Sequence, residues 1–137
     1  MEKTLILYPA IGMMILTLFV YVKNYLNFVK AKKSNAVKFS YFKTYQGEVP
    51  DYMDVSRQTL KNQFELPIFF YFLISIILVF DKVSQLDLIL AWIFVASRYL
   101  HCYIRLSSNH VPNRAKVFQL GMLVLIAWWI IFLYNIL

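Results

Sequence analysis

The stretch Lys61–Leu73, "KNQFELPIFFYFL", places polar and charged residues directly against a run of large apolar side chains. Asn62 and Glu65 are three positions apart, so they share one face of a helix. The apolar run is typical of a helix in lipid, where an ionisable residue is costly unless it has a partner, a ligand or water. The stretch therefore predicts a membrane helix that carries a polar site.

The composition of the whole chain agrees with that prediction. Hydrophobic residues make up 61% of the 137 residues, whereas a soluble domain has about 45–50%. Four nearly uncharged segments are each about 20 residues long, the length that crosses about 30 Å of hydrocarbon. The sequence therefore predicts an all-α integral membrane protein, a four-transmembrane-helix bundle that forms one domain over residues 1–137. The expected helices cover about residues 4–29, 57–80, 86–107 and 114–137.

Basic residues are concentrated in two of the three connections between these helices. The first connection and its borders carry Lys30, Lys32, Lys33, Lys38, Lys43 and Arg57, and the last carries Arg114 and Lys116. The middle connection, "DKVSQLD", balances Lys82 against Asp81 and Asp87. The positive-inside rule then places both basic connections in the cytoplasm and both termini outside.

The net charge of +7 is explained mainly by this topology, with contact to anionic membrane lipids as a second contribution. Nucleic-acid binding is not expected, because the sequence contains no soluble basic domain. Cys102 is the only cysteine, which excludes an intramolecular disulfide. The sequence shows no spacing of metal ligands, so no metal site is expected.

Two of the predicted helices carry ionisable stripes inside the membrane. On the second helix Arg57, Lys61 and Glu65 recur at every fourth position, and on the third Arg98, His101 and Arg105 share a face. Arg98 is the deepest of these cations and is the expected ion-pair partner of Glu65. Snorkelling to the headgroups remains open for Arg57, Lys61 and Arg105, and a purely structural role remains open for His101.

Cations outnumber acids in the cytoplasmic half of the bundle. Lys61, Arg98, Arg105 and Arg114 converge there against a single acid, Glu65. This excess suits an amphiphilic anion whose carboxylates contact the cations, with an amine near Glu65 and an amide backbone near Asn62. Four helices barely enclose such a cavity, so a cleft between the subunits of an oligomer is expected.

At these residues the chain resembles the MAPEG family, the membrane-associated proteins in eicosanoid and glutathione metabolism, and in particular its small bacterial members. The resemblance covers nearly the whole chain and rests on "VKAKK", "KNQFELP", "RYLHCYIRL" and "PNRAKVF", in that order. The most specific element is the N-x-x-E of Asn62 and Glu65, with a basic residue directly before it.

This resemblance implies a homotrimer that binds glutathione between neighbouring subunits near the cytosolic side, and a bacterial inner membrane as the expected location. The predicted glutathione-binding residues are Lys30, Lys61, Asn62, Glu65, Arg98, His101 and Arg105. Arg114 matches the arginine thought to stabilise the glutathione thiolate and is the predicted catalytic residue. That role is chemically reasonable, because a nearby cation favours the ionised, nucleophilic form of a thiol.

The chain also departs from the pattern of the family. Ala115 and Phe118 stand where catalytic members often have a tyrosine or serine near the sulfur, and Arg105 stands at a helix-three tyrosine. Lys30 and Lys61 replace arginines, which removes bidentate recognition of carboxylates.

Three functions follow from these observations. The leading hypothesis is a membrane-bound glutathione transferase or peroxidase that acts on a hydrophobic small-molecule electrophile from the bilayer. The alternative is a non-catalytic binding or scaffold protein with the same fold, which Ala115 and Phe118 favour. A third hypothesis, a small oligomeric transporter with Glu65 as its coupling acid, fits the excess of cations less well.

The predicted topology can be tested by labelling introduced cysteines from one side of the membrane. Because Asn35 and Asn109 lie in the two basic connections, both positions should be labelled from the cytoplasmic side. Gln85, in the middle connection, should be labelled only from the opposite side. Labelling of Asn35 and Gln85 from the same side would contradict the topology.

Overall fold

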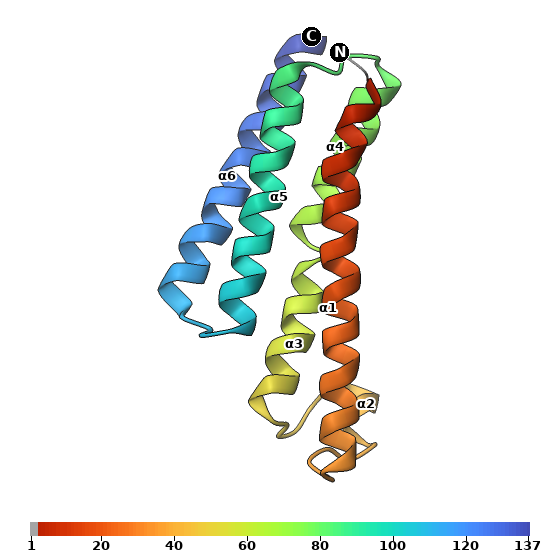
Figure 1. Cartoon of the computed structure of the whole chain (residues 1–137), viewed down its shortest axis with the longest axis vertical. Helices are drawn as coiled ribbons and strands as arrows, with labels where there is room; N and C mark the ends of the chain where they lie inside the picture. Colours follow the sequence, from red (N-terminus) through yellow and green to blue (C-terminus); the bar gives the residue numbers. More distant parts are fainter. Residues whose placement is uncertain (1–2) are drawn as a thin grey trace.

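The computed structural model describes residues 3–137, which form helices joined by short connections (Figure 1). The elements are η1 (Lys3–Ile6), α1 (Leu7–Lys33), α2 (Tyr41–Thr44), α3 (Asp51–Asn62), α4 (Leu66–Val79), α5 (Gln85–Leu106) and α6 (Val111–Ile136). Four helical stretches within the described residues are long and apolar enough to cross a membrane: Lys3–Lys33, Asp51–Val79, Gln85–Leu106 and Val111–Ile136. The predicted all-α fold with four transmembrane helices is confirmed.

The connections alternate between the two ends of the bundle. The beginning of η1, the α4–α5 turn and the end of α6 lie together at the top of Figure 1, whereas the α1–α3 connection and the α5–α6 turn lie toward the bottom. At the upper end Lys3 forms an ion pair with Asp81 of the α4–α5 turn. Both basic connections therefore lie on the same side of the bundle, as the charge pattern predicted.

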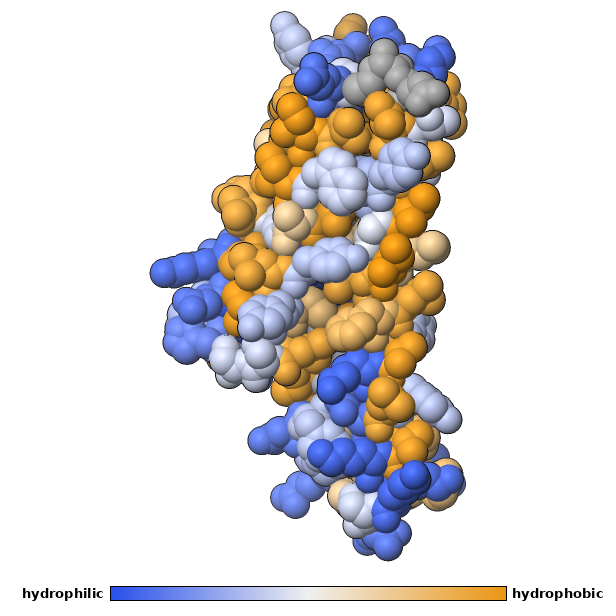
Figure 2. Space-filling model, viewed as in Figure 1, coloured by the Kyte–Doolittle hydropathy of each residue, from blue (hydrophilic) through white to orange (hydrophobic). Residues whose placement is uncertain are grey.

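The outer surface is mostly apolar. On the face shown in Figure 2, hydrophobic residues cover most of the middle of the bundle, and hydrophilic residues gather toward its ends. Large side chains such as Phe19, Phe69, Leu123 and Ile130 are each more than half exposed. A surface of this kind is stable in lipid and not in water, so the protein is an integral, multi-pass membrane protein.

The second membrane-crossing stretch contains a break, which corrects the continuous helix expected over residues 57–80. Helix α3 ends at Asn62 and α4 begins at Leu66. Pro67, at the start of α4, lacks an N–H and its ring clashes with the carbonyl of the residue four positions earlier, so the helix cannot continue through Gln63. The chain instead forms a tighter turn of the 3-10 type. The N–H groups of Gln63 and Phe64 each donate to the carbonyl three residues earlier, at 3.0 Å.

A buried carboxylate joins the upper ends of α5 and α6. Ser84 and Asp87 form a capping box at the start of α5, in which the Ser84 N–H donates to Asp87 Oδ2 at 2.8 Å. Asp87 is only 7% exposed, and its other oxygen accepts a hydrogen bond of 2.6 Å from the indole N–H of Trp128 on α6. The Asp87 carboxylate therefore caps the start of α5 and also bonds α5 to α6 through Trp128.

The interior between the helices is packed with aromatic side chains. The rings of Phe70 and Phe94 stack with centroids 4.8 Å apart, and Trp128 meets Phe70 edge-on at 6.1 Å. Below this cluster α5 and α6 approach each other closely at Ser97 and Gly121, where a Cβ on Gly121 would lie 2.5 Å from Ser97 Oγ. The absence of a side chain at Gly121 allows this contact.

Replacement of Gly121 by alanine should lower the stability of the bundle. An added methyl group would collide with Ser97, and overpacking of this kind costs about 1–3 kcal/mol. The measurement is thermal unfolding of the purified chain in detergent.

Gly12→Ala is the matched control, because a Cβ at Gly12 meets its nearest neighbours at an ordinary 3.7 Å. This control should unfold at or above the temperature of the unmodified chain, since alanine favours a helix over glycine. Ser97→Ala should partly rescue Gly121→Ala. Equal effects of the two glycine substitutions would contradict the close contact.

Candidate functional site

The candidate site is built around the end of α3 at the helix break. The last carbonyls of a helix lack intrahelical donors, and in lipid water does not supply them. Arg98 of α5 is 1% exposed and its Nη2 donates to the carbonyl oxygen of Asn62 at 3.1 Å. A cation is also favourable at the negative end of a helix. Arg98 of α5 therefore caps the C-terminal end of α3.

The predicted ion pair between Glu65 and Arg98 is not formed. Within residues 3–137 the salt bridges join Lys3 to Asp81 and Arg57 to Asp54, and Glu65 takes part in neither. The reason is the break, because Glu65 follows the end of α3 and no longer continues the stripe of Lys61. Glu65 is exposed and stands as the residue before α4, where a carboxylate is favourable to the helix dipole.

A chain of polar side chains runs along α3 and joins it to α5. Gln58 accepts a hydrogen bond of 2.6 Å from Arg105 Nη2 and donates one of 2.5 Å to Asp54. With the Asn62 amide oriented to match its neighbours, Oδ1 lies 3.2 Å from Arg105 Nη1 and Nδ2 lies 3.0 Å from Glu65 Oε2. Asn62, Glu65 and Arg105 are thus brought together as predicted.

Gln58 is a residue of this site that the sequence reasoning missed. Its position four residues after Asp54 is the spacing at which helical side chains meet, so the link to Asp54 could have been found. The contact with Arg105, 47 positions away in the sequence, could not.

Phe118 of α6 lies against two of the predicted site residues. The Arg98 guanidinium is 5.3 Å from the centroid of the Phe118 ring, and the His101 ring is 5.5 Å from it. Both distances are typical of cation–π and aromatic contacts. Phe118, which stood out as a departure from the family pattern, therefore forms an apolar wall of the site.

Several buried nitrogen atoms of the site have no hydrogen-bond partner within residues 3–137. They are Nε and Nη1 of Arg98, Nε of Arg105 and Nδ1 of His101. These three side chains are at most 8% exposed. A buried charge without an acceptor is costly, so unpaired guanidinium N–H groups gathered in one place can bind an anion such as a carboxylate.

The remaining predicted residues lie around this cluster at different distances. Arg114, half-buried in the first turn of α6, donates from Nη1 to the side chain of Asn109. Lys61 is exposed and lines a groove with Arg57 and Gln58. Lys30 lies near the end of α1, with its amine 4.6 Å from the centroid of the Tyr52 ring. Lys30 therefore contacts α3 well before the break rather than the arginine cluster of its own subunit.

Comparison with known protein families gives a match. The model of the MAPEG family matches residues 7–134, which is nearly the whole chain. No curated protein and no solved structure matches the chain.

The capping role of Arg98 predicts a large effect of its removal. Arg98→Met should destabilise the protein by about 1–3 kcal/mol, because the Asn62 carbonyl would be left buried without its donor. Thermal unfolding in detergent without added ligand measures this effect. Lys61→Met is the control and should change little, since Lys61 is exposed. Glu65→Gln should also have a small effect, and a loss as large as that of Arg98→Met would restore the ion-pair hypothesis.

Proposed function

The chain belongs to the MAPEG family, and on that premise we propose that it is a glutathione-binding membrane protein with transferase or peroxidase activity on hydrophobic electrophiles. The observation that carries the proposal is the cluster of unpaired, buried N–H groups on Arg98 and Arg105 beside the Asn62–Glu65 pair. Membership of the family supports glutathione as the anion for which this cluster is built.

The chemistry of the cluster fits the two ends of glutathione. Glutathione carries two carboxylates, one ammonium group and two amides, so it needs several cations, one acid and an amide partner. Lys61, Arg98 and Arg105 supply the cations, Glu65 the acid and Asn62 the amide. Glu65 and Asn62 are already hydrogen-bonded to each other, which holds the acid in a defined position.

The proposed reaction requires a nucleophile near the apolar interior of the membrane. Glutathione, when bound, supplies a thiolate that can attack an electrophilic carbon or a peroxide oxygen. Arg114 holds a positive charge at the first turn of α6, where it favours the ionised form of a nearby thiol. Phe118, one turn further along α6, presents an apolar surface suited to a hydrophobic substrate.

We further propose that the active form is a homotrimer and that the glutathione site lies between subunits. Support comes from Lys30, which contacts Tyr52 and not the arginine cluster of its own subunit. The cluster is open to a neighbouring subunit through the exposed side chains of Lys61 and Glu65. The proposed orientation places this site toward the cytoplasm, together with both basic connections.

A non-catalytic binding protein is the second candidate, and a specific observation favours it. Phe118 cannot donate a hydrogen bond to sulfur, and its ring is engaged by Arg98 and His101. A protein with this site could hold glutathione without activating its thiol. Binding and turnover therefore need separate measurements.

Binding is tested first, by isothermal titration calorimetry of the purified chain with glutathione in detergent. Asn62→Ala should weaken binding by up to about tenfold, because one hydrogen bond contributes about 0.5–1.5 kcal/mol. Lys82→Ala, at the opposite end of the bundle, is the matched control and should bind like the unmodified chain. If the unmodified chain releases no heat and shows no binding, glutathione is not the ligand.

Turnover is tested with a generic electrophile and, separately, with an organic hydroperoxide. Arg114→Ala should lower kcat by at least about tenfold while leaving glutathione affinity nearly unchanged, because one opposite charge shifts a thiol pKa by about one unit or more. Lys116→Ala, an exposed cation on the same helix, is the control and should retain full activity. Phe118→Tyr should raise kcat by adding a hydrogen-bond donor near the sulfur. Binding without any turnover in the unmodified chain would decide for the non-catalytic protein.

A further inference from the structure

Within residues 3–137, the two arginines of the cluster are hydrogen-bonded only to uncharged acceptors. Arg98 Nη2 donates to the backbone carbonyl of Asn62 at 3.1 Å, and Arg105 Nη2 donates to Gln58 Oε1 at 2.6 Å. With the Asn62 amide oriented to match its neighbours, its oxygen lies 3.2 Å from Arg105 Nη1. In the described part of the chain neither arginine takes part in a salt bridge. The two guanidinium groups are therefore held in position without being paired with a carboxylate.

Acids lie close by, but an amide side chain stands between each acid and Arg105. Gln58 donates from its Nε2 to Asp54 Oδ2 at 2.5 Å. Asn62, in the same orientation as before, donates from Nδ2 to Glu65 Oε2 at 3.0 Å. Each amide accepts from the arginine with its oxygen and donates to an acid with its nitrogen, which is possible because an amide carries both kinds of group. The two amides therefore separate Arg105 from both acids.

This arrangement follows from helical spacing on α3. Asp54, Gln58 and Asn62 are four positions apart, so their side chains form one row along the helix. Arg105 of α5 contacts the second and third members of the row. Asp54 also accepts a hydrogen bond of 2.9 Å from Arg57 Nη2, so a cation of its own helix already engages it. The amide of Gln58 is thus oriented from both of its ends.

The uncharged character of Gln58 matters for what Arg105 can bind. A hydrogen bond to an ionised acceptor is roughly twice as strong as one to a neutral acceptor. A carboxylate at this position would hold Arg105 in an ion pair, and the carboxylate of a ligand would have to compete with it. Arg105 is 8% exposed, and its Nε has no partner among the described residues. The cost of burying this charge is therefore relieved when an anion binds.

We propose that Gln58 is a positioning residue, which holds Arg105 in place and keeps its charge available to an anionic ligand. Asp54 acts through Gln58, because it fixes the orientation of the amide. The inference rests on the proposed function, in which the anion is a carboxylate of glutathione. It makes the neutral side chain at position 58 a determinant of affinity for anions, although Gln58 itself carries no charge.

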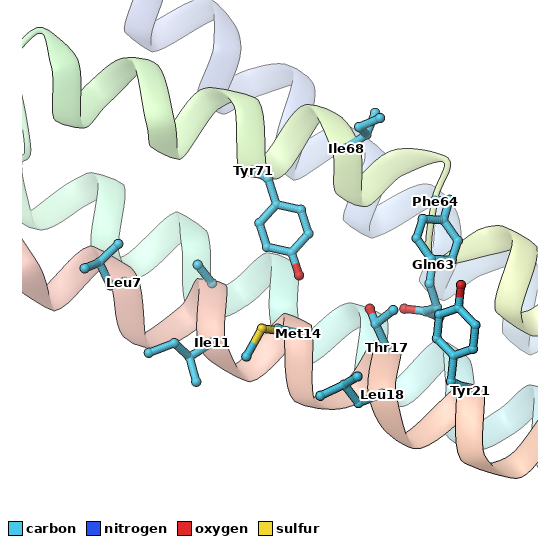
Figure 3. A pocket seen from close by; sticks show the side chains of 11 residues that line it. Leu7, Ile11, Met14, Thr17, Leu18, Tyr21, Gln63, Phe64, Ile68 and Tyr71 are labelled. Atoms are coloured by element: carbon cyan, nitrogen blue, oxygen red, sulfur yellow. The ribbon is translucent and has the colours of Figure 1, made fainter.

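Gln63 offers a comparison, because it is a buried amide on the same segment that faces another part of the molecule. Figure 3 shows its side chain beside Thr17 and Tyr21, on the side of α1. Its hydrogen bond goes to the Thr59 carbonyl at 3.5 Å and not to a cation. Loss of the Gln63 amide therefore reports on packing near the helix break, without removing an acceptor of Arg105.

The test exchanges the acid and the amide, by combining Asp54→Asn with Gln58→Glu. The exchange conserves the net charge and can keep each hydrogen bond of the row, but it places the carboxylate against Arg105. Glutathione binding, measured by isothermal titration calorimetry, should weaken by at least about tenfold. The melting temperature of the ligand-free chain in detergent should rise, because a buried cation gains a partner. Asp54→Asn alone is the matched control and should bind within about twofold of the unmodified chain.

The opposite signs of these two effects separate a positioning role from a purely structural one, in which affinity and stability fall together. Gln58→Met, which removes the acceptor without adding a charge, should lower both, whereas Gln63→Met should leave the affinity unchanged. Unweakened binding by the exchanged chain, or a lower ligand-free melting temperature, overturns the proposal. If the unmodified chain does not bind glutathione, the proposed function fails. The melting temperatures then still decide the role of Gln58, because they require no ligand.

Discussion

The structure depends on one hydrogen bond, from the guanidinium of Arg98 to the carbonyl of Asn62. Pro67 forces α3 to end inside the membrane, and hydrocarbon offers no donor for the carbonyls that are released. An arginine from α5 supplies one. This single requirement brings a positive charge to the centre of the fold, and the nearby side chains follow from it. Phe118 covers the guanidinium with its ring, and the chain of Arg105, Asn62 and Glu65 forms beside it.

The same requirement connects the fold to the proposed function. A guanidinium has five N–H donors, and the cap on α3 uses one of them. The N–H groups at Nε and Nη1 of Arg98 are buried and have no hydrogen-bond partner among residues 3–137. In the proposed function, a residue that stabilises a broken helix also provides donors for an anionic ligand. This proposed double role accounts for a buried arginine with so few partners of its own.

The sequence predicted the elements whose causes are local. Apolar length and the distribution of lysine and arginine were sufficient for four membrane helices and for two basic connections at one end of the bundle. The position of Arg98 and Arg105 on one face of α5 also followed from helical spacing, whereas Glu65 lies beyond the end of α3. The break itself was missed although Pro67 lies in the most informative stretch, because the apolar run that follows Pro67 was taken as one helix with the polar residues before it.

Contacts between helices were harder to predict than the helices. Opposite charge suggested Glu65 as the partner of Arg98. The observed partner is instead the carbonyl of Asn62, which has no intrahelical donor because α3 ends there. Gln58 and Phe118 became part of the site through α5 and α6, whose rotation about their axes is set by packing over the whole bundle. Such rotations depend on many side chains at once, and no short motif encodes them.

The link between Asp87 and Trp128 gives α5 and α6 one fixed end. It lies at the start of α5, while the close contact of Ser97 with Gly121 lies farther along toward the arginine cluster. Beyond this contact the two helices are joined by the contacts of the Phe118 ring with Arg98 and His101 and by the short turn after Leu106. The half of the α5–α6 pair that carries the arginine cluster is therefore joined through the ring of Phe118, whereas the opposite half is joined through a buried carboxylate.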